Sequence, residues 1–174
     1  MKLKVGLAVL AVLAGVTLTG CSPIVTLTPP AHDAASAKCA SVIATLELDV
    51  PTVSGLTPRT TDTQGTAAWG TPADILLRCG VAVPDPTSTL PCVTVSGVDW
   101  LTKIHAHDVY VFTTFGRDPA VAVTVDTADI DVNSDKALAD LAVAIDTIPS
   151  KHHCVAPGES GQGASTPTPS PTDP

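Results

Sequence analysis

The stretch VYVFTTFGRDPAVAVTV, residues 109–125, indicates the fold of this chain more directly than any other. Val109, Val111, Thr113 and Phe115 occupy alternate positions over 109–115, and Val121, Val123 and Val125 do so over 121–125. This two-residue period is typical of a β-strand with one buried face. Residues 116–119, Gly-Arg-Asp-Pro, have the composition of a turn. We therefore expect two antiparallel strands joined as a hairpin.

Further strands are expected before this hairpin. Residues 75–79 form a short apolar run that fits a buried strand. Between Cys92 and Ile104 the apolar side chains occupy odd positions before Gly97 and even positions after it. A change of parity at a glycine predicts a bulge or a tight turn there. The sequence thus predicts an antiparallel sheet of three to five strands.

Two segments flanking the strands have apolar residues at helical spacing. We predict helices over about 33–48 and 134–148, capped by Asp33 and Ser134 and ended by Pro51 and Pro149. The apolar positions that carry this pattern are Cys39, Val42, Ile43 and Leu46 in the first helix, and Leu138, Leu141, Ala142 and Ile145 in the second. The order helix, strands, helix predicts an α+β domain, stapled by disulfides, with both helices packed on one face of the antiparallel sheet.

The first twenty residues have the pattern of an export signal. Lys2 and Lys4 precede an apolar run over 5–16, which is too short to favour a transmembrane helix. Leu18-Thr19-Gly20-Cys21 matches a lipobox, so we predict that residues 1–20 are removed by cleavage between Gly20 and Cys21. Diacylglycerol and palmitate on Cys21 would hold the chain on the outer, extracytoplasmic side of the cell membrane.

The rest of the chain divides by composition. Residues 21–32 are rich in proline and are interpreted as a lipidated tether, 33–154 as a single globular domain, and 155–174 as a disordered tail rich in Ser, Thr and Pro. Loss of two lysines with the signal leaves 7 basic and 17 acidic residues, a net charge near −10. Binding to nucleic acid requires a basic surface, so this charge argues against a nucleic-acid partner.

The four cysteines after Cys21 form an even set in a compartment where disulfides persist. Three connectivities are possible. Cys79 and Cys92 flank a turn-rich loop, and antiparallel helices would bring Cys39 close to Cys154. We therefore favour the pairs Cys79–Cys92 and Cys39–Cys154.

The sequence shows no pattern that identifies a catalytic, metal or cofactor site. Acidic residues and an asparagine from Asp129 to Asp140 partly follow a calcium-loop spacing, but Ser134 replaces the glycine of the sharp turn, and a helix cap explains them better. His105, His107, His152 and His153 lack zinc-site spacing, and Asp99, Asp108 and Asp118 are scattered near turns. Trp69 and Trp100 are interpreted as core residues, with a binding surface around them as the alternative.

Three ordered blocks carry a resemblance to a known family. They are TAAWGTPA running into LRCGV within residues 66–81, CVTVSGVDW over 92–100, and FTTFGRDPA over 112–120. Together they resemble a family of actinobacterial membrane lipoproteins described only as a domain of unknown function, over roughly 37–150. The resemblance implies an envelope lipoprotein and no particular activity.

Two classes of function fit these observations. The first is a non-catalytic binding or assembly module that contacts an envelope protein or glycan. Its contact surface is expected around Trp69 and Trp100. The second is a hydrolase or transferase that acts on envelope material, for which a set of polar residues held together by the fold is required. A purely structural role is the third alternative.

Overall fold

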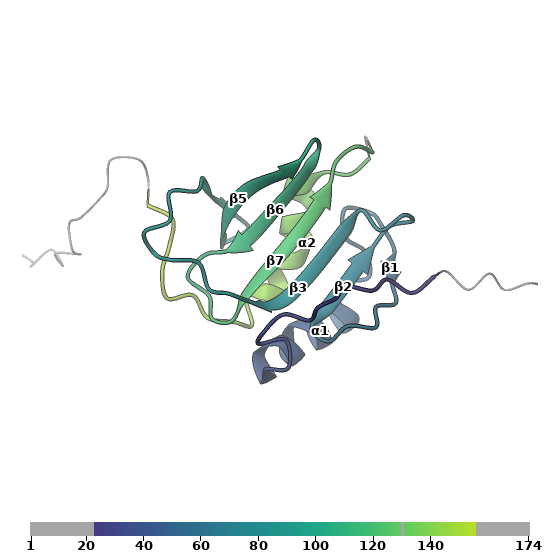
Figure 1. The fold of residues 1–174 in the computed structure, drawn as a ribbon, viewed down its shortest axis with the longest axis horizontal. Coiled ribbons are helices and arrows are strands. Elements are labelled where there is room, and N and C mark those ends of the chain that lie inside the picture. The colour runs from purple at the N-terminus through teal and green to yellow at the C-terminus, as the bar shows by residue number, and fades with distance from the viewer. Residues whose placement is uncertain (1–22, 130, 156–174) are drawn as a thin grey trace, which may run out of the picture.

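The computed structural model describes residues 23–129 and 131–155, so the predicted signal peptide, Cys21 and nearly all of the tail lie outside it. The described chain is an α+β domain with two helices and a single sheet of seven strands that differ in length (Figure 1). In chain order the elements are α1 (Ala37–Asp49), β1 (Pro58–Arg59), β2 (Thr66–Trp69), β3 (Ile75–Val81), β4 (Cys92–Val95), β5 (Val98–Ala106), β6 (Val109–Thr114), β7 (Ala120–Asp126) and α2 (Ser134–Ile145).

The sheet is antiparallel throughout, with the strand order β1-β2-β3-β7-β6-β5-β4. The predicted hairpin is confirmed as β6 and β7, and β7 pairs on its other side with β3. The turn predicted at Gly97 is confirmed too, because Ser96 and Gly97 both have positive φ between β4 and β5.

The prediction of three to five strands is wrong, because β1 and β2 were missed. β1 has only two residues, one of them Pro58, and a pairing that short leaves no alternating pattern to detect. The four residues of β2 are mostly buried in succession and show no alternation of apolar with polar side chains either.

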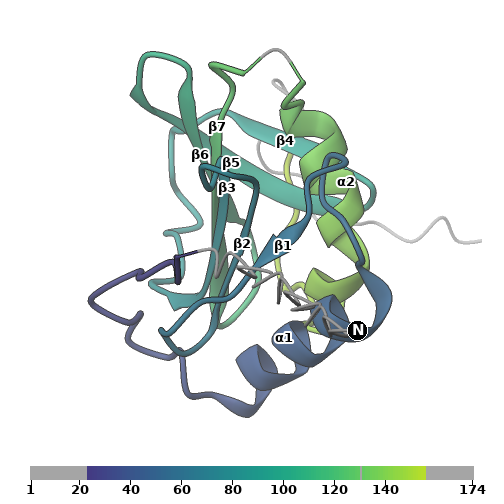
Figure 2. The same cartoon turned by 90° about the vertical axis from the view of Figure 1, so that its right-hand side faces the viewer.

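Both helices lie on the same face of the sheet, as predicted (Figure 2). Of the predicted positions in α1, Cys39, Val42 and Leu46 are buried and Ile43 is partly buried. In α2 all four predicted positions are buried, together with Ala137 and Ala144. These side chains join the inward residues of β3, β6 and β7 in one core cluster.

The helix boundaries differ from the predicted ones. Ser36 rather than Asp33 caps α1, and its hydroxyl accepts a hydrogen bond from the Cys39 N–H. Asn133 rather than Ser134 caps α2, where its side-chain oxygen accepts from the Lys136 N–H. At the start of each helix a polar side chain thus accepts a hydrogen bond from an N–H that has no partner within the helix.

The segment predicted as a tether is extended, but its described part lies against the domain. Val25 forms a parallel bridge with Thr61, and its N–H donates to the Thr60 carbonyl at 2.9 Å. Leu27 is buried, and the Leu27 N–H donates to the Thr63 hydroxyl at 3.1 Å. The boundary between tether and domain predicted at residue 33 therefore does not separate free chain from folded chain.

The same segment continues across the end of β3. The Asp33 N–H donates to the Gly80 carbonyl at 3.0 Å, and a side chain on Gly80 would approach the backbone nitrogen of Ala34 to 2.3 Å. Gly80 also has a φ of +92°, which side chains disfavour. Only glycine lets the entering chain come this close to the sheet.

A search for membrane-spanning helices among residues 23–129 and 131–155 finds none that is long and apolar enough.

Candidate functional site

The disulfides join Cys39 to Cys79 and Cys92 to Cys154, so the predicted pairing is wrong. Its error lies in the strand order. Cys79 is on β3 and Cys92 begins β4, and β7, β6 and β5 lie between these strands. Four steps of about 4.8 Å put the two cysteines far beyond the roughly 7 Å limit between bridged Cα atoms.

The observed pairs follow from the packing. Cys39 in the first turn of α1 lies over β3, where Cys79 faces the helices, and both residues are fully buried. The chain after α2 returns to the opposite edge of the sheet, where Cys154 meets Cys92 on β4. This second disulfide is only partly buried.

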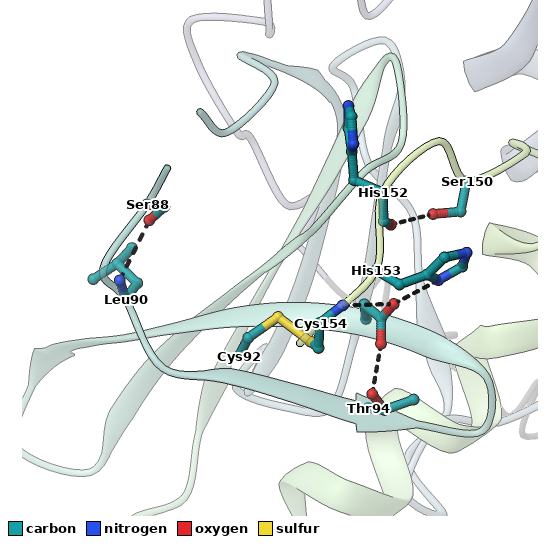
Figure 3. The surroundings of a disulfide bond; sticks show 9 residues. Ser88, Leu90, Cys92, Thr94, Ser150, His152, His153 and Cys154 are labelled. Carbon is teal, nitrogen blue, oxygen red and sulfur yellow. Dashed lines mark hydrogen bonds and ion pairs between the residues drawn. A yellow bond between two sulfur atoms is a disulfide. The ribbon is translucent and has the colours of Figure 1, made fainter. Parts of the chain in front are cut away.

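A polar cluster surrounds the Cys92–Cys154 disulfide (Figure 3). Asp99 on β5 is 5% exposed, and its carboxylate accepts hydrogen bonds from the Thr94 hydroxyl, from the Cys154 N–H at 3.3 Å and from Nδ1 of His153 at 2.9 Å. Two other segments, β4 and residues 153–154, thus meet at a carboxylate of β5. We call Thr94, Asp99, His153 and the Cys154 N–H the Asp99 cluster.

The cluster changes the ionisation of its central residue. Burial disfavours the charged form of Asp99, but the hydrogen bonds from Thr94, His153 and the Cys154 N–H, with the positive charge of His153, outweigh it and lower the pKa of Asp99 below its ordinary value. The carboxylate is therefore charged at neutral pH, and the segment that ends at Cys154 is held to it.

The pairing of a buried aspartate with Nδ1 of a histidine can orient a general base. Such a base needs a nucleophile or a bound water at its other nitrogen. In the part of the chain that the structure describes, the hydrogen bond of His153 is to Asp99, and no hydroxyl is bonded to the histidine directly. The nearby Thr94 hydroxyl donates to Asp99 instead. Both nearby cysteines are in the disulfide. The arrangement therefore acts first as a clamp on the C-terminal segment.

Arg117, predicted as a turn residue, has a second buried role. Its side chain is 3% exposed, and its guanidinium donates to the carbonyls of Ile145 and Ile148 and pairs with Asp146 at 3.1 Å. Ile145 is the last residue of α2 and Ile148 lies in the turn that follows, so the guanidinium stands at the C-terminal end of the helix, where the helix dipole favours a positive charge. The sequence gives no sign of this role, because the arginine lies in a turn that is distant from α2 along the chain.

The turn also receives the C-terminal segment. The Lys151 N–H donates to the Gly116 carbonyl at 2.7 Å, and a side chain on Gly116 would meet the backbone oxygen of His152 at 2.1 Å. Gly116 has a φ of +74°. The FTTFGRDPA block therefore contains a hairpin turn, the cap of α2 and the support of residues 150–153.

The histidines do not come together as one group. His105 near the end of β5 and His107 just after the strand are exposed, whereas Asp99 lies near the start of β5 beside His153. His105 is six residues from Asp99, or about 20 Å along the strand. His107 pairs instead with Asp108 at 3.1 Å. Asp118 interacts with Lys151 at 3.4 Å, so the three scattered aspartates have separate partners.

The residues of the calcium-like spacing take structural roles where they are described. Asn133 caps α2, and Asp140 accepts from the Ser54 N–H and from Lys136. Ile130 of this segment lies outside the described residues. Within residues 23–129 and 131–155, no group of three or more His, Cys, Asp or Glu side chains is arranged to hold a metal ion.

Burial and the neighbouring charges of Asp126 and Asp129 raise the pKa of Asp74 above its ordinary value. Asp74 and Asp126 lie side by side next to the pairing of β3 with β7, where the Asp126 N–H donates to the Asp74 carbonyl at 2.8 Å.

Both tryptophans are core residues, as interpreted from the sequence, with exposures of 2% for Trp69 and 0% for Trp100. The alternative of a surface built around both is excluded for Trp100 by its complete burial. Trp69 differs, because it lines a groove of about 450 Å³ between α1 and the β1–β2 edge. The groove residues are Ile43, Leu46, Glu47, Val50, Pro51, Pro58, Arg59, Thr60, Thr61, Thr66, Ala67, Ala68 and Trp69, and we call this hollow the α1 groove.

Comparison with known proteins identifies a family. A family model described as "Protein of unknown function (DUF3515)" matches residues 2–153, nearly the whole chain. No curated protein and no solved structure matches it.

Proposed function

The chain belongs to the family of proteins of unknown function DUF3515, and on that premise we propose that it is a lipid-anchored lipoprotein on the extracytoplasmic side of the cell membrane. Its role is that of a non-catalytic binding or assembly module. The lipid on Cys21 provides the contact with the membrane, and the folded domain provides the contact with an envelope partner.

The use of the five cysteines carries this proposal. Four of them form two disulfides within the domain, an arrangement that persists in oxidising compartments outside the cytoplasm. The fifth, Cys21, stands at the end of a leucine–threonine–glycine–cysteine lipobox that follows a basic and apolar segment. Export and lipidation together account for all five cysteines.

The polar and apolar features of the domain favour binding over catalysis. The Asp99 cluster has its hydrogen bonds satisfied by the protein itself and holds the C-terminal segment in place. The α1 groove, by contrast, is open, and seven of its thirteen lining side chains are aliphatic or proline, which suits a ligand with an apolar part. A net charge near −10 for the mature chain disfavours nucleic acid as a partner.

A hydrolase or transferase is the second candidate, because the Asp99–His153 pair has the geometry that orients a histidine base. If this pair were catalytic, His153→Ala would abolish turnover of activated esters while the fold persisted. We expect the wild-type protein and His153→Ala to show the same background hydrolysis of p-nitrophenyl acetate. A difference of about a hundredfold, typical of a lost general base, would favour the enzyme.

Metabolic labelling tests the lipoprotein proposal. Cells that express the full-length protein are grown with alkyne-tagged palmitate, and the tag is detected after reduction with thiol. We expect label on the wild type and on Ser22→Ala, and none on Cys21→Ala. Mass spectrometry of the mature N-terminus should give a peptide that begins with acylated Cys21. An unlabelled wild type, or a labelled Cys21→Ala variant, contradicts the proposal.

A further inference from the structure

The α1 groove continues along the helix beyond the first hollow. A second hollow of about 280 Å³ shares Ile43 and Glu47 with it and runs toward the start of α1. The second hollow is lined by small residues, which leave space beside the helix. They include Ala34, Ala35, Ala40, Ala44 and Gly65. The two hollows are therefore neighbours along one side of α1, and the name α1 groove covers both of them from here on.

The wall of the α1 groove along the helix is mainly aliphatic. Ile43 is half-buried at the junction of the two hollows, and Ala67 and Trp69 form part of the opposite wall. The polar side chains of the lining are the charged Glu47 and Arg59 and five neutral residues, Ser36, Thr60, Thr61, Gln64 and Thr66. The aliphatic wall along α1 suits a hydrocarbon chain, whereas a sugar or a peptide would bring more polar groups that need partners.

The N-terminal segment enters at the rim of this groove. Arg59 lines the groove, and its guanidinium donates to the Pro23 carbonyl at 2.7 Å. Thr60 and Thr61, which also line it, are the residues along which Val25 pairs. Arg59 is itself held by the Gly70 carbonyl at 2.7 Å. The described chain therefore begins with Pro23 fixed beside the groove.

If the mature chain begins at Cys21, only Ser22 separates the lipidated residue from Pro23. Two residues span at most about 7 Å, so the lipid would start close to the groove rim. Attachment to the same chain gives that lipid a high effective concentration at the groove, which a free lipid or a partner protein lacks.

We propose that the α1 groove holds one acyl chain of the diacylglycerol carried by Cys21. This inference rests on the proposed lipidation of Cys21. It has a consequence for anchoring, because two inserted chains hold a protein stably on a membrane whereas one gives reversible binding. An acyl chain held in the groove is not inserted in the bilayer. The groove therefore shortens the residence time of the protein on the membrane.

Photo-crosslinking tests this assignment on the full-length lipidated protein. Cells are grown with a diazirine-bearing palmitate analogue, and the purified protein in detergent is irradiated, reduced and digested with trypsin. We expect the acylated peptide that begins at Cys21 to be joined to peptides 39–59 and 60–78, which contain the α1 and β2 walls of the groove. The lipidated N-terminal peptide joined to neither of them would overturn the proposal.

Two variants and a matched control locate the site. Ile43→Glu places a charge in the groove, and Ala67→Phe fills it, so each should lower the crosslink yield about tenfold or more. Leu48→Glu adds the same charge to the same helix at a side chain that is 82% exposed, and it should leave the yield unchanged. Thermal melts show which variants fold, and Ala67→Phe serves if Ile43→Glu does not. An equal loss in Leu48→Glu contradicts a groove-specific contact.

The same digest separates the remaining outcomes. A groove peptide that carries the mass of a free lipid, without the Cys21 peptide, would show that the occupant is a membrane lipid, and the proposal of an intramolecular chain would be wrong. Absence of any acyl group on Cys21 overturns both the lipoprotein proposal and this one. An acylated Cys21 without groove crosslinks overturns this one alone.

Discussion

On the helix side of the sheet Cys39–Cys79 lies fully buried between α1 and β3, whereas at the far edge Cys92–Cys154 is partly exposed and fastens a terminal segment to β4. The loops that they close are of similar length, 40 and 62 residues. Loop-closure entropy alone gives each about 4 kcal/mol, with slightly more for the longer loop. Packing reverses this order, because only the first bond is part of the core.

The comparison shows that one covalent bond can serve two structural purposes. Loss of the buried bond leaves a packing defect at the junction of helix and sheet. Loss of the edge bond lets residues 150–155 loosen in the folded protein. The conformational entropy that the folded state gains in this way offsets part of the entropy that the unfolded state gains when the loop is opened. The core itself need not change.

The largest expected effect is therefore the removal of the buried disulfide. We expect Cys39→Ala with Cys79→Ala to lower the free energy of unfolding by about 5 kcal/mol, from loop closure and the lost core contacts. The matched pair Cys92→Ala with Cys154→Ala should cost only about 2 kcal/mol, because the released segment recovers entropy. Urea unfolding followed by the fluorescence of the buried tryptophans measures both. A larger loss for the edge pair would show that loop length outweighs packing.

Arg117 sharpens the comparison, because it is a buried anchor for the end of α2, from which the chain continues to the edge disulfide. We expect Arg117→Met to destabilise the protein by about 3 kcal/mol, since the carbonyls at the C-terminal end of α2 lose their donor and Asp146 loses its partner. Lys103→Met removes the same charge from an exposed strand position and should cost less than about 0.5 kcal/mol. Equal losses in a urea titration would mean that charge, and not the cap, matters at this position.

The smallest expected effect concerns the pH dependence of the edge clamp. Because the pKa of Asp99 is lower in the folded protein than in the unfolded chain, its carboxylate adds stability above the unfolded pKa of about 3.9, and this contribution is lost as the pH falls through the lower folded value. We expect Asp99→Asn to lower the free energy of unfolding by about 1 kcal/mol at pH 7, and by much less at a pH below the folded pKa of Asp99.

Urea titrations of the wild type and Asp99→Asn between pH 2.5 and pH 7 measure this difference. Asp62 and Asp85 also have lowered pKa values, from hydrogen bonds to neighbouring threonines, but they are present in both proteins and cancel. A stability difference that stays constant with pH would contradict a role for the charged form of Asp99 in holding Cys154.

The elements that the sequence predicted well are those whose signal lies within a few residues. The alternation over 109–125 predicted β6 and β7, the parity change predicted the turn at Gly97, and the spacing of apolar residues predicted α1 and α2. In β7 and in the two helices the pattern marks the side of the element that is buried, and burial on one side is a local property of the chain. In β6 it marks the wrong side, because the buried side chains are Phe112 and Thr114 rather than Val109, Val111 and Thr113. The short strands β1 and β2 were missed because they are too brief to show a period.

The sequence by itself determined an α+β domain with two helices on one face of an antiparallel sheet, and it set out the three possible cysteine pairings. Only the tertiary structure decided among those pairings, because β3 joins β7 rather than β4 and so separates Cys79 from Cys92. It also decided that Asp99 meets His153, and that the N-terminal segment lies along the rim of the α1 groove. These contacts join residues far apart in the chain, so they depend on the order in which strands pair, and periodicity within a segment carries no information about that order.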